Sequence, residues 1–273
     1  MAGALAADGH HVTALPRAST TGVDGADVVI NLAGESIAGG RWSASRKQEI
    51  LDSRVATTRR LADAINGAAQ PPRVFISGSA VGFYGPHADD MVTEATPPGD
   101  DFLARVCVAW EAEANRAAAR TRVVCIRTGL VLERDGGALP QMLPPFWFGA
   151  GGPVGTGRQY WPWIHRADWM ALVRWAIEHD AAIGPLNATA PNPETNKLFA
   201  AALGRAIRRP AFMPAPAFAL RLLLGQMADA LLLSGQRAVP EKAQASGFQF
   251  QYPQLDRALD SLFSTPRVFA TRR

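Results

Sequence analysis

Cysteine is scarce in this chain of 273 residues, with Cys107 and Cys125 as its two members. They are too few and too dispersed for a disulfide framework or a thiolate zinc site. His165 and Asp168 are spaced for one helical turn, but two ligands do not make a metal site, so we predict no metal. A reducing, cytoplasmic compartment is the expected location.

Long hydrophobic runs and runs of one charge are also missing. The most apolar stretch, 214–233, is interrupted by Arg221, Gln226 and Asp229, so it predicts an amphipathic helix instead of a membrane span. The N-terminus shows no basic start followed by an apolar region, and no secretory signal is predicted. Lysine and arginine exceed aspartate and glutamate by 28 to 24, without clustering. We therefore expect neither nucleic acid nor a membrane as partner.

Short β-branched runs alternate with longer amphipathic patterns in the first half of the chain. Helices are expected over 44–66 and 101–119, where apolar residues recur at three-to-four spacing. Buried strands are expected over 12–15, 28–32, 74–77 and 123–127. This rhythm predicts an α/β fold with a Rossmann-like, doubly wound parallel sheet.

The rhythm changes after Gly136, where a stretch rich in proline and glycine leads to further helices. We expect residues 1–135 to form the nucleotide-binding domain, with its sheet completed by parts of 136–190. Residues 136–273 are expected to form a smaller, mostly helical C-terminal lobe on the substrate side. The run GGPVGTG at 151–157 lacks the Lys-Ser/Thr pair of a phosphate loop and follows no strand, so it is not a Walker motif.

Small and polar residues follow two of the expected strands. The run NLAGES at 31–36 and the run SGSAVGFYG at 77–85 come where a parallel sheet leaves a crevice for ligands. Each run also suits an ordinary turn, and for the first run the two interpretations are equally good. Ser79 does not lie in a nucleophile elbow, because Ser77 occupies the place where glycine is needed. A hydrolase is therefore disfavoured.

Several long segments resemble the epimerase-like branch of the atypical extended short-chain dehydrogenase/reductases. The resemblance extends from about residue 5 to the last helix near Phe263 and is highly specific. The segments that carry it are NLAGESIAGGRW at 31–42, SGSAVGFYG at 77–85, PPGDDFLARVCVAWE at 97–111, LPPFWFGAGGPVGTGRQYWPWIH at 143–165 and GPLNATAPNPETN at 184–196.

The resemblance implies a nicotinamide dinucleotide cofactor and a small-molecule substrate. Arg17 follows the position where an acid would bind the ribose hydroxyls of NAD, so NADP is favoured over NAD. Glu35 and Asn187 are the expected substrate contacts, and Ser79 and Tyr84 the expected catalytic residues, the first polarising an oxygen and the second exchanging a proton. The expected cofactor contacts are Pro16, Arg17, Asn31, Leu32, Ala33, Gly34, Glu49, Arg54, Ser77 and Leu130.

The chain departs from the pattern of extended reductases at two places that bear on chemistry. Leu103 and Cys107 occupy the positions of the usual Tyr-x-x-x-Lys pair, so Ser79 lacks its customary partners. No strand and glycine-rich turn precede the helix that ends near Gly9, and the segment 17–25 is too short for a helix and a further strand. We therefore expect weak binding of the pyrophosphate and loss of an edge strand.

Two functions remain open at this point. The first is an NADP-binding enzyme that acts on a small polar metabolite, with a nucleotide sugar as one candidate. It would be either an epimerase, which is an isomerase, or a reductase, which is an oxidoreductase. The second is a dinucleotide-sensing or partner-binding protein without turnover, which the missing Tyr-x-x-x-Lys pair favours. The apolar face of 220–233 is compatible with a homodimer, although core packing explains its leucines equally well.

Overall fold

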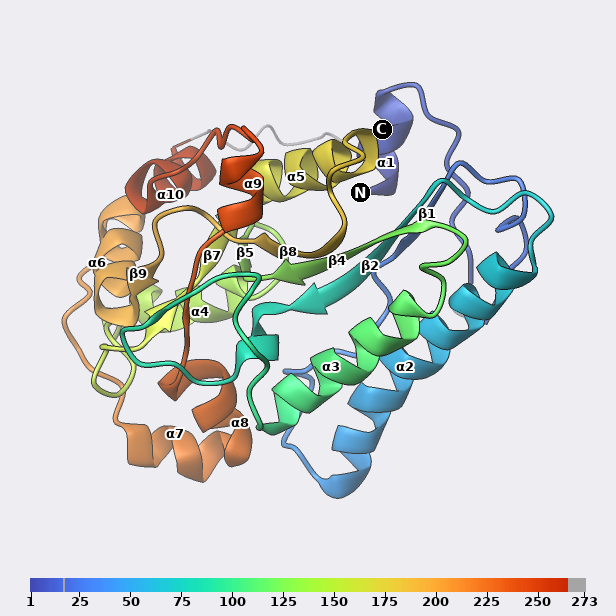
Figure 1. The fold of residues 1–273 in the computed structure, drawn as a ribbon. Coiled ribbons are helices and arrows are strands. Elements are labelled where there is room, and N and C mark those ends of the chain that lie inside the picture. Colours follow the sequence, from blue (N-terminus) through green and yellow to red (C-terminus); the bar gives the residue numbers. More distant parts are fainter. Residues whose placement is uncertain (17, 265–273) are drawn as a thin grey trace, which may run out of the picture.

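The computed structural model describes residues 1–16 and 18–264. Its centre is a parallel sheet in the order β1-β2-β4-β8 (Figure 1). The strands of this sheet are β1 (Val28–Asn31), β2 (Val74–Ala80), β4 (Arg122–Thr128) and β8 (Gly184–Ala188). The predicted α/β class with a Rossmann-like parallel sheet is confirmed. Strand β8 comes from the second half of the chain and pairs with β4.

Both faces of the sheet are buried, which explains why its strands are continuously apolar. Successive side chains point to opposite faces, so Phe75, Val123 and Cys125 form a core with α2 (Ala44–Gly67) and α3 (Phe102–Asn115). The opposite face packs against α5 (Arg166–Glu178) through Val74, Ile76, Val124 and Ile126. Figure 1 shows α2 and α3 side by side on one side of the sheet and α5 on the other.

The two long helices begin where the sequence offers side-chain caps. Ser43 accepts a hydrogen bond from the backbone N–H of Arg46, and Asp101 accepts one from the N–H of Ala104. Each bond satisfies a donor that has no partner within its helix. The expected ranges of both helices are therefore correct at their N-termini, while α3 ends at Asn115 instead of residue 119.

Arg122, at the start of β4, fixes the C-terminal end of α5. Its Nη1 donates to the carbonyl oxygens of Ala176 and Ala182 at 2.7 and 2.8 Å, and its Nη2 donates to that of Ile177 at 2.9 Å. Helix C-terminal carbonyls carry partial negative charge and lack partners within the helix. A guanidinium at this point therefore couples the sheet to α5.

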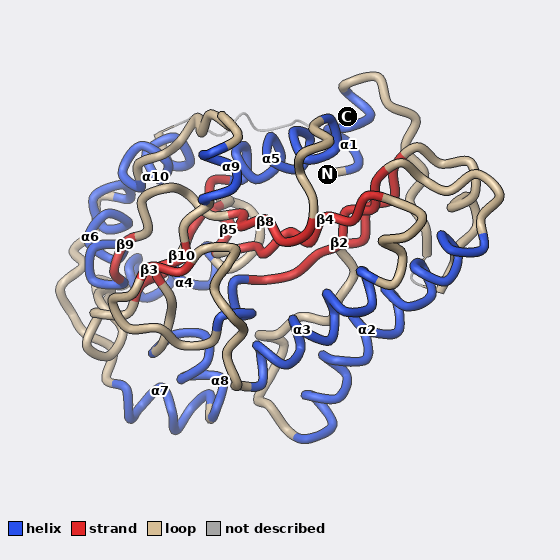
Figure 2. Tube along the Cα trace, in the orientation of Figure 1, coloured by secondary structure: helices blue, strands red, loops and turns tan. Residues whose placement is uncertain are grey.

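The remaining elements lie around this sheet (Figure 2). A second core contains Trp163, Phe199, Leu203 and Leu259, and in it α6 (Asn196–Ile207) packs against α10 (Leu255–Phe263). The short strands are β3 (Met91–Val92), β5 (Leu130–Leu132), β6 (Tyr160–Trp161), β7 (Trp163–His165), β9 (Glu194–Thr195) and β10 (Arg237–Ala238). The helices are α1 (Ala2–Ala7), the 3-10 turn Val81–Tyr84, α4 (Leu139–Trp147), α6 (Asn196–Ile207), α7 (Ala217–Leu224), α8 (Gln226–Ala228), the π-turn Asp229–Leu233, α9 (Glu241–Ala245) and α10 (Leu255–Phe263).

The predicted strand at 12–15 is wrong. This segment forms no strand, and Val12 and Leu15 are exposed. A β-branched run becomes a strand only where a neighbouring strand and a core face cover it, and here neither is provided.

The predicted single helix over 214–233 is also wrong, because it is broken at Gly225. Gly225 adopts φ 62°, a conformation that favours glycine, and it separates α7 from α8. Met227 and Ala228 are buried, whereas Phe218, Leu222 and Leu223 of α7 are exposed. Within the described ranges, no helix is both long enough and apolar enough to cross a bilayer.

The burial and capping role of His165 predict how the stability of the folded protein depends on pH. Its Nδ1 accepts a hydrogen bond from the N–H of Ala167 at 3.1 Å, which caps α5, and burial lowers the pKa of the imidazole. Below about pH 6.5, the ordinary histidine pKa, the unfolded chain therefore binds more protons at this position than the folded protein. The stability that neutral His165 contributes is complete above that pH and is lost as the pH falls below it.

We expect His165→Asn to reduce this acid sensitivity, because asparagine caps helices without titrating. The measurement is urea denaturation at about pH 8 and about pH 5.5, with His10→Asn on the exposed N-terminal segment as control. Equal loss of stability in the wild type and in His165→Asn would contradict the assignment.

Candidate functional site

The carboxyl edge of the sheet brings together side chains that lie far apart in the sequence. Asn31 ends β1, and the β2 residues Ser77 and Ser79 lie opposite Cys125 and Arg127 of β4. Asn187 of β8 is the register partner of Arg127. This gathering follows from the parallel topology, in which all strands end at one edge.

Ser79 belongs to a buried ion-pair network at this edge. Its Oγ donates a hydrogen bond to Oε1 of Glu111 on α3 at 2.7 Å. Arg127 donates to the same carboxylate through Nε at 2.8 Å and through Nη2 at 2.9 Å. This two-point contact is the strongest arrangement available to an arginine and a carboxylate. The guanidinium also lies over the Phe83 ring, 3.4 Å from its centre.

The network continues through Tyr84 to the C-terminal lobe. The Tyr84 hydroxyl donates to Oδ1 of Asn187 at 2.6 Å and accepts from Nη1 of Arg127 at 3.1 Å. The Asn187 side chain in turn donates to the carbonyl of Val239 at 2.8 Å. Glu94 accepts from the backbone N–H of Asn187 at 2.9 Å and from that of Lys242 at 3.3 Å. The network therefore joins the sheet to the segment that enters α9.

The three residues expected to take part in catalysis or substrate binding are buried. Ser79 is 5% exposed, Tyr84 1% and Asn187 0%, and each has its polar group bonded within the protein. Burial also raises the pKa of Tyr84 to about 12, although Arg127 acts in the opposite direction. In this geometry the hydrogen bonds of the three side chains are structural, and the catalytic roles of Ser79 and Tyr84 and the substrate contact of Asn187 stay predictions.

Glu111 and Arg127 are not among the site residues expected from the sequence. The sequence does carry a signal for them, because each is a charged residue within an apolar pattern. Arg127 follows the run Val-Val-Cys-Ile, and Glu111 lies on the buried face of α3. A buried charge without a partner destabilises the folded protein, so two buried charges of opposite sign indicate an ion pair.

The other half of the edge, beside β1, is more open. Leu32 is 43% exposed, and Ala33 and Gly34 are partly exposed. The Asn31 side chain holds this loop, because it donates to Thr58 Oγ1 at 2.8 Å and accepts from the N–H of Ala33 at 3.2 Å. The Glu35 N–H donates to Ser53 Oγ at 3.0 Å. The loop is thus fixed against α2 while its outer side faces solvent.

Arg54 presents a cation at this open half. Its guanidinium lies 5.2 Å from the centre of the Trp110 ring and donates to the carbonyl of Ile50 at 3.0 Å. No carboxylate lies within ion-pair distance of Arg54 in the part of the chain that the structure describes. Burial lowers the pKa of Arg54, against the opposing effect of Glu35. A half-buried arginine without a carboxylate partner is suited to bind an anion.

Two glycines allow this stack to form. A Cβ on Gly34 would lie 2.9 Å from Cζ of Arg54, and a Cβ on Gly78 would lie 2.7 Å from Cζ2 of Trp110. Both distances are shorter than carbon atoms tolerate. Gly34 and Gly78 therefore set the position of Arg54 from opposite ends of the stack.

The remaining predicted cofactor residues differ in burial. Ser77 is fully buried and its hydroxyl donates to the Gly78 carbonyl at 3.3 Å, so its side chain cannot reach a ligand here. Glu49 is exposed and pairs with Arg46 at 2.9 Å, and Pro16 is exposed. Leu130 lies partly buried in β5, while Arg17 lies outside the described residues.

Comparison with known proteins gives the family. The profile of the NAD dependent epimerase/dehydratase family matches residues 12–188. The chain belongs to this family. A second profile, a domain of unknown function named DUF1731, matches residues 215–262, which include α7, α8 and most of α10.

Relatives in this family cover most of the chain. Epimerase family protein SDR39U1 of Mus musculus is 43% identical over 245 residues, which is 88% of this chain and 83% of the relative. Epimerase family protein YfhF of Bacillus subtilis is 43% identical over 240 residues, with coverage of 87% and 78%.

Solved structures agree with this assignment. The crystal structure of human SDR39U1 with NADPH has a TM-score of 0.86 and 38% identity, covering 90% of this chain and 85% of that one. The nucleoside-diphosphate sugar epimerase of Corynebacterium glutamicum has a TM-score of 0.70 and 33% identity, covering 89% of this chain and 47% of that one.

We predict that Glu111→Gln lowers the free energy of unfolding by about 3–5 kcal/mol, because it leaves the Arg127 charge buried without its partner. Replacing both residues, with Glu111→Leu and Arg127→Met, should recover much of this loss. Guanidinium denaturation measures both effects. Glu113→Gln on the same helix, which breaks pairs with the more exposed Arg59 and Arg116, should cost about 1 kcal/mol or less. Equal losses for Glu111→Gln and Glu113→Gln would refute a structural role for the network.

Proposed function

We propose that this protein binds NADPH at the open half of the carboxyl edge. The observation that carries the proposal is Arg54, a half-buried guanidinium that pairs with no carboxylate of the described residues and lies beside the accessible segment Leu32–Gly34. The phosphates of a dinucleotide are the anions that such a group favours. The NADPH in the related human structure supports the same ligand.

The residues at this half fit a dinucleotide. Gly34 leaves room for the Arg54 guanidinium beside the backbone, and Leu32 and Ala33 offer an apolar surface for an adenine ring. From the family resemblance, Pro16, Arg17, Glu49 and Leu130 are proposed as further contacts, with Arg17 favouring NADP over NAD. When bound, the cofactor would supply hydride chemistry.

The proposed activity is that of an epimerase or reductase on a small polar metabolite, with a nucleotide sugar as the leading candidate. The names of the related proteins support this class. Glu35 lies at the partly exposed rim of the site and remains the proposed substrate contact. Ser79 and Tyr84 are proposed to position Glu111, Arg127 and Asn187 instead of exchanging protons with a substrate.

A second function, dinucleotide sensing without turnover, is favoured by one observation. The two hydroxyls expected to act in catalysis are both buried and bonded to other side chains. Mass spectrometry of ligands that remain on the purified protein would separate the two functions. A retained sugar nucleotide that is altered on incubation indicates an enzyme, whereas a retained dinucleotide that stays unchanged with every sugar nucleotide tried indicates a sensor.

Replacing Arg54 with methionine should weaken NADPH binding roughly tenfold to a hundredfold, the loss expected for one charge-assisted contact. Fluorescence titration of NADPH measures the dissociation constant. Arg158→Met, at an exposed position of the C-terminal lobe, is the matched control and should bind as the wild type does. Unchanged affinity in Arg54→Met would exclude Arg54 as the phosphate contact.

A further inference from the structure

Exposed apolar side chains gather on the loop that follows α4, on the segment that precedes α7, and on α7 itself. The loop and the segment run side by side, because the N–H of Met213 donates to the Gly151 carbonyl at 3.0 Å and that of Ala215 donates to the Pro153 carbonyl at 2.8 Å. The chain enters α7 two residues later. We call these side chains the apolar patch: Trp147, Phe148, Phe212, Met213, Phe218, Leu222 and Leu223.

The apolar patch is large for the surface of a soluble domain. Phe148 is 88% exposed, and Phe212 and Phe218 are each 74% exposed. Since one phenylalanine offers roughly 150–250 Å², these three rings alone leave several hundred Å² of apolar surface in water. Exposed apolar patches above a few hundred Å² mark interaction surfaces.

Helix α7 is the part of the patch that most needs a cover. Seven of its eight residues are apolar, Arg221 being the exception, yet none of the eight is buried. An isolated helix of this length is marginal in water, because packing against other groups supplies most of the stability of a helix. Figure 1 shows α7 at the lower edge of the molecule, away from the central sheet. Its outer faces are therefore accessible to a partner.

The charges around the apolar patch are almost all positive. The segments 139–158 and 195–228, which form the patch, contain no aspartate or glutamate. Their basic residues are Arg158, Lys197, Arg205, Arg208, Arg209 and Arg221. Arg205 and Arg221 pair with carboxylates that lie outside the two segments.

Arg208 and Arg209 carry the remaining charges nearest to the patch. Both are exposed, and neither forms an ion pair among the residues that the structure describes. The Arg209 guanidinium lies over the Trp147 ring, 5.6 Å from its centre, which places a cation beside the aromatic side chains. Arg208 adopts φ 56°, so the chain has an arginine where glycine would be less strained.

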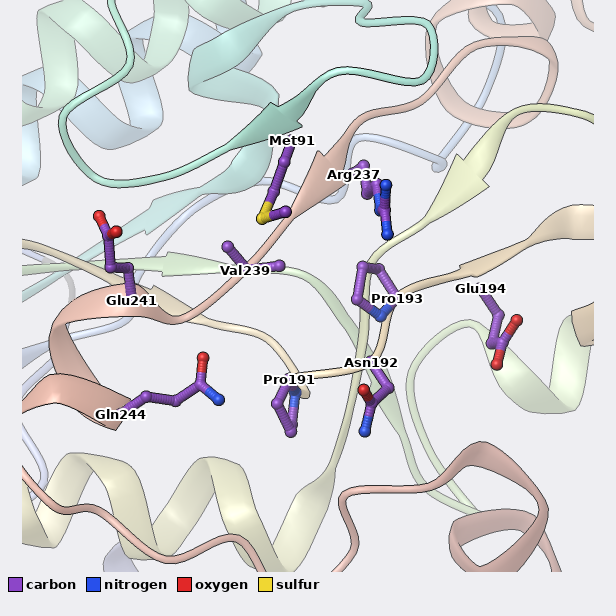
Figure 3. A pocket seen from close by; sticks show the side chains of 9 residues that line it. All are labelled: Met91, Pro191, Asn192, Pro193, Glu194, Arg237, Val239, Glu241 and Gln244. Carbon is purple, nitrogen blue, oxygen red and sulfur yellow. The ribbon is translucent and has the colours of Figure 1, made fainter.

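A groove elsewhere in the second half of the chain lacks this uniform charge. Its volume is about 380 Å³, and it shares no residue with the apolar patch. Figure 3 shows Glu194 and Glu241 around it together with Arg237. Because charges of both signs surround this groove, it does not favour an anionic surface.

Charge decides between two ways to cover the apolar patch. In a two-fold dimer the same surface of each copy meets. Arg208 and Arg209 would then find no carboxylate in the two patch segments of the second copy. A bilayer with anionic lipids offers phosphates to the arginines and hydrocarbon to the rings on one face. We propose that the apolar patch docks on the surface of such a bilayer without crossing it.

The sequence predicts no membrane partner, because it contains no run of one charge and no long apolar run. The patch and its arginines come from segments that meet only in the fold, as the stacking of Arg209 on Trp147 shows. The pattern that a bilayer would recognise is therefore absent from any single stretch of the sequence.

Flotation of the full chain with lipid vesicles tests the proposal. Phosphatidylcholine vesicles with about one third phosphatidylglycerol should bind the protein, pure phosphatidylcholine should bind it more weakly, and added salt should reduce the binding. Replacing Phe148, Phe212 and Phe218 together with glutamine should weaken binding roughly tenfold or more, because the rings no longer enter the hydrocarbon. Arg208→Gln combined with Arg209→Gln should also weaken it roughly tenfold or more.

Matched controls change side chains away from the apolar patch. Met91→Gln removes an exposed apolar side chain at the groove of Figure 3. Arg59→Gln combined with Arg116→Gln removes two exposed positive charges from α2 and the end of α3. Both controls should bind vesicles nearly as the wild type does. Urea denaturation verifies that each variant is folded.

Three results would overturn the proposal. The first is the absence of wild-type binding to the anionic vesicles. The second is binding that neither patch variant weakens. The third is a wild-type dimer in analytical ultracentrifugation that becomes a monomer when the three phenylalanines are replaced, because a second copy would then cover the patch. NADPH is left out of every sample, so the outcome does not depend on the proposed cofactor site.

Discussion

The ion pair between Glu111 and Arg127 determines what the carboxyl edge of this protein can do. Both charges are buried, and a buried pair is stable only if its geometry is good and its remaining donors and acceptors are satisfied. Ser79 and Tyr84 meet this requirement, since one bonds the carboxylate and the other the guanidinium. Both hydroxyls are thereby bonded within the protein.

This constraint divides the edge into two parts with different properties. The part formed by β2, β4 and β8 is closed and links the sheet to the C-terminal lobe through Asn187 and Glu94. The part beside β1 stays accessible, and Arg54 is held there by Trp110 and by the space that Gly34 and Gly78 leave. Arg54 pairs with no carboxylate among the described residues, and this is why we propose that phosphate binds in this second part.

The sheet could be predicted from the sequence because its signals are local. The runs at 28–32, 74–77 and 123–127 are rich in β-branched residues and are buried on both faces. Ser43 and Asp101 each cap a helix by accepting a hydrogen bond from the backbone N–H three residues later. The site could not be predicted in the same way. Tyr84 and Asn187 lie 103 positions apart, and the bond between them depends on the crossover that places β8 beside β4. The strand prediction for 12–15 is wrong for the same reason, because the local sequence pattern does not say whether a neighbouring strand exists.

Hydrogen–deuterium exchange with and without NADPH tests the division of the edge most directly. We predict that NADPH protects backbone amides of the 32–54 segment. We expect no change in the segments 191–194 and 237–244, and little change in β4, whose amides are already paired. Protection confined to 191–194 and 237–244, or no protection in 32–54 at saturating NADPH, would contradict the division of the edge.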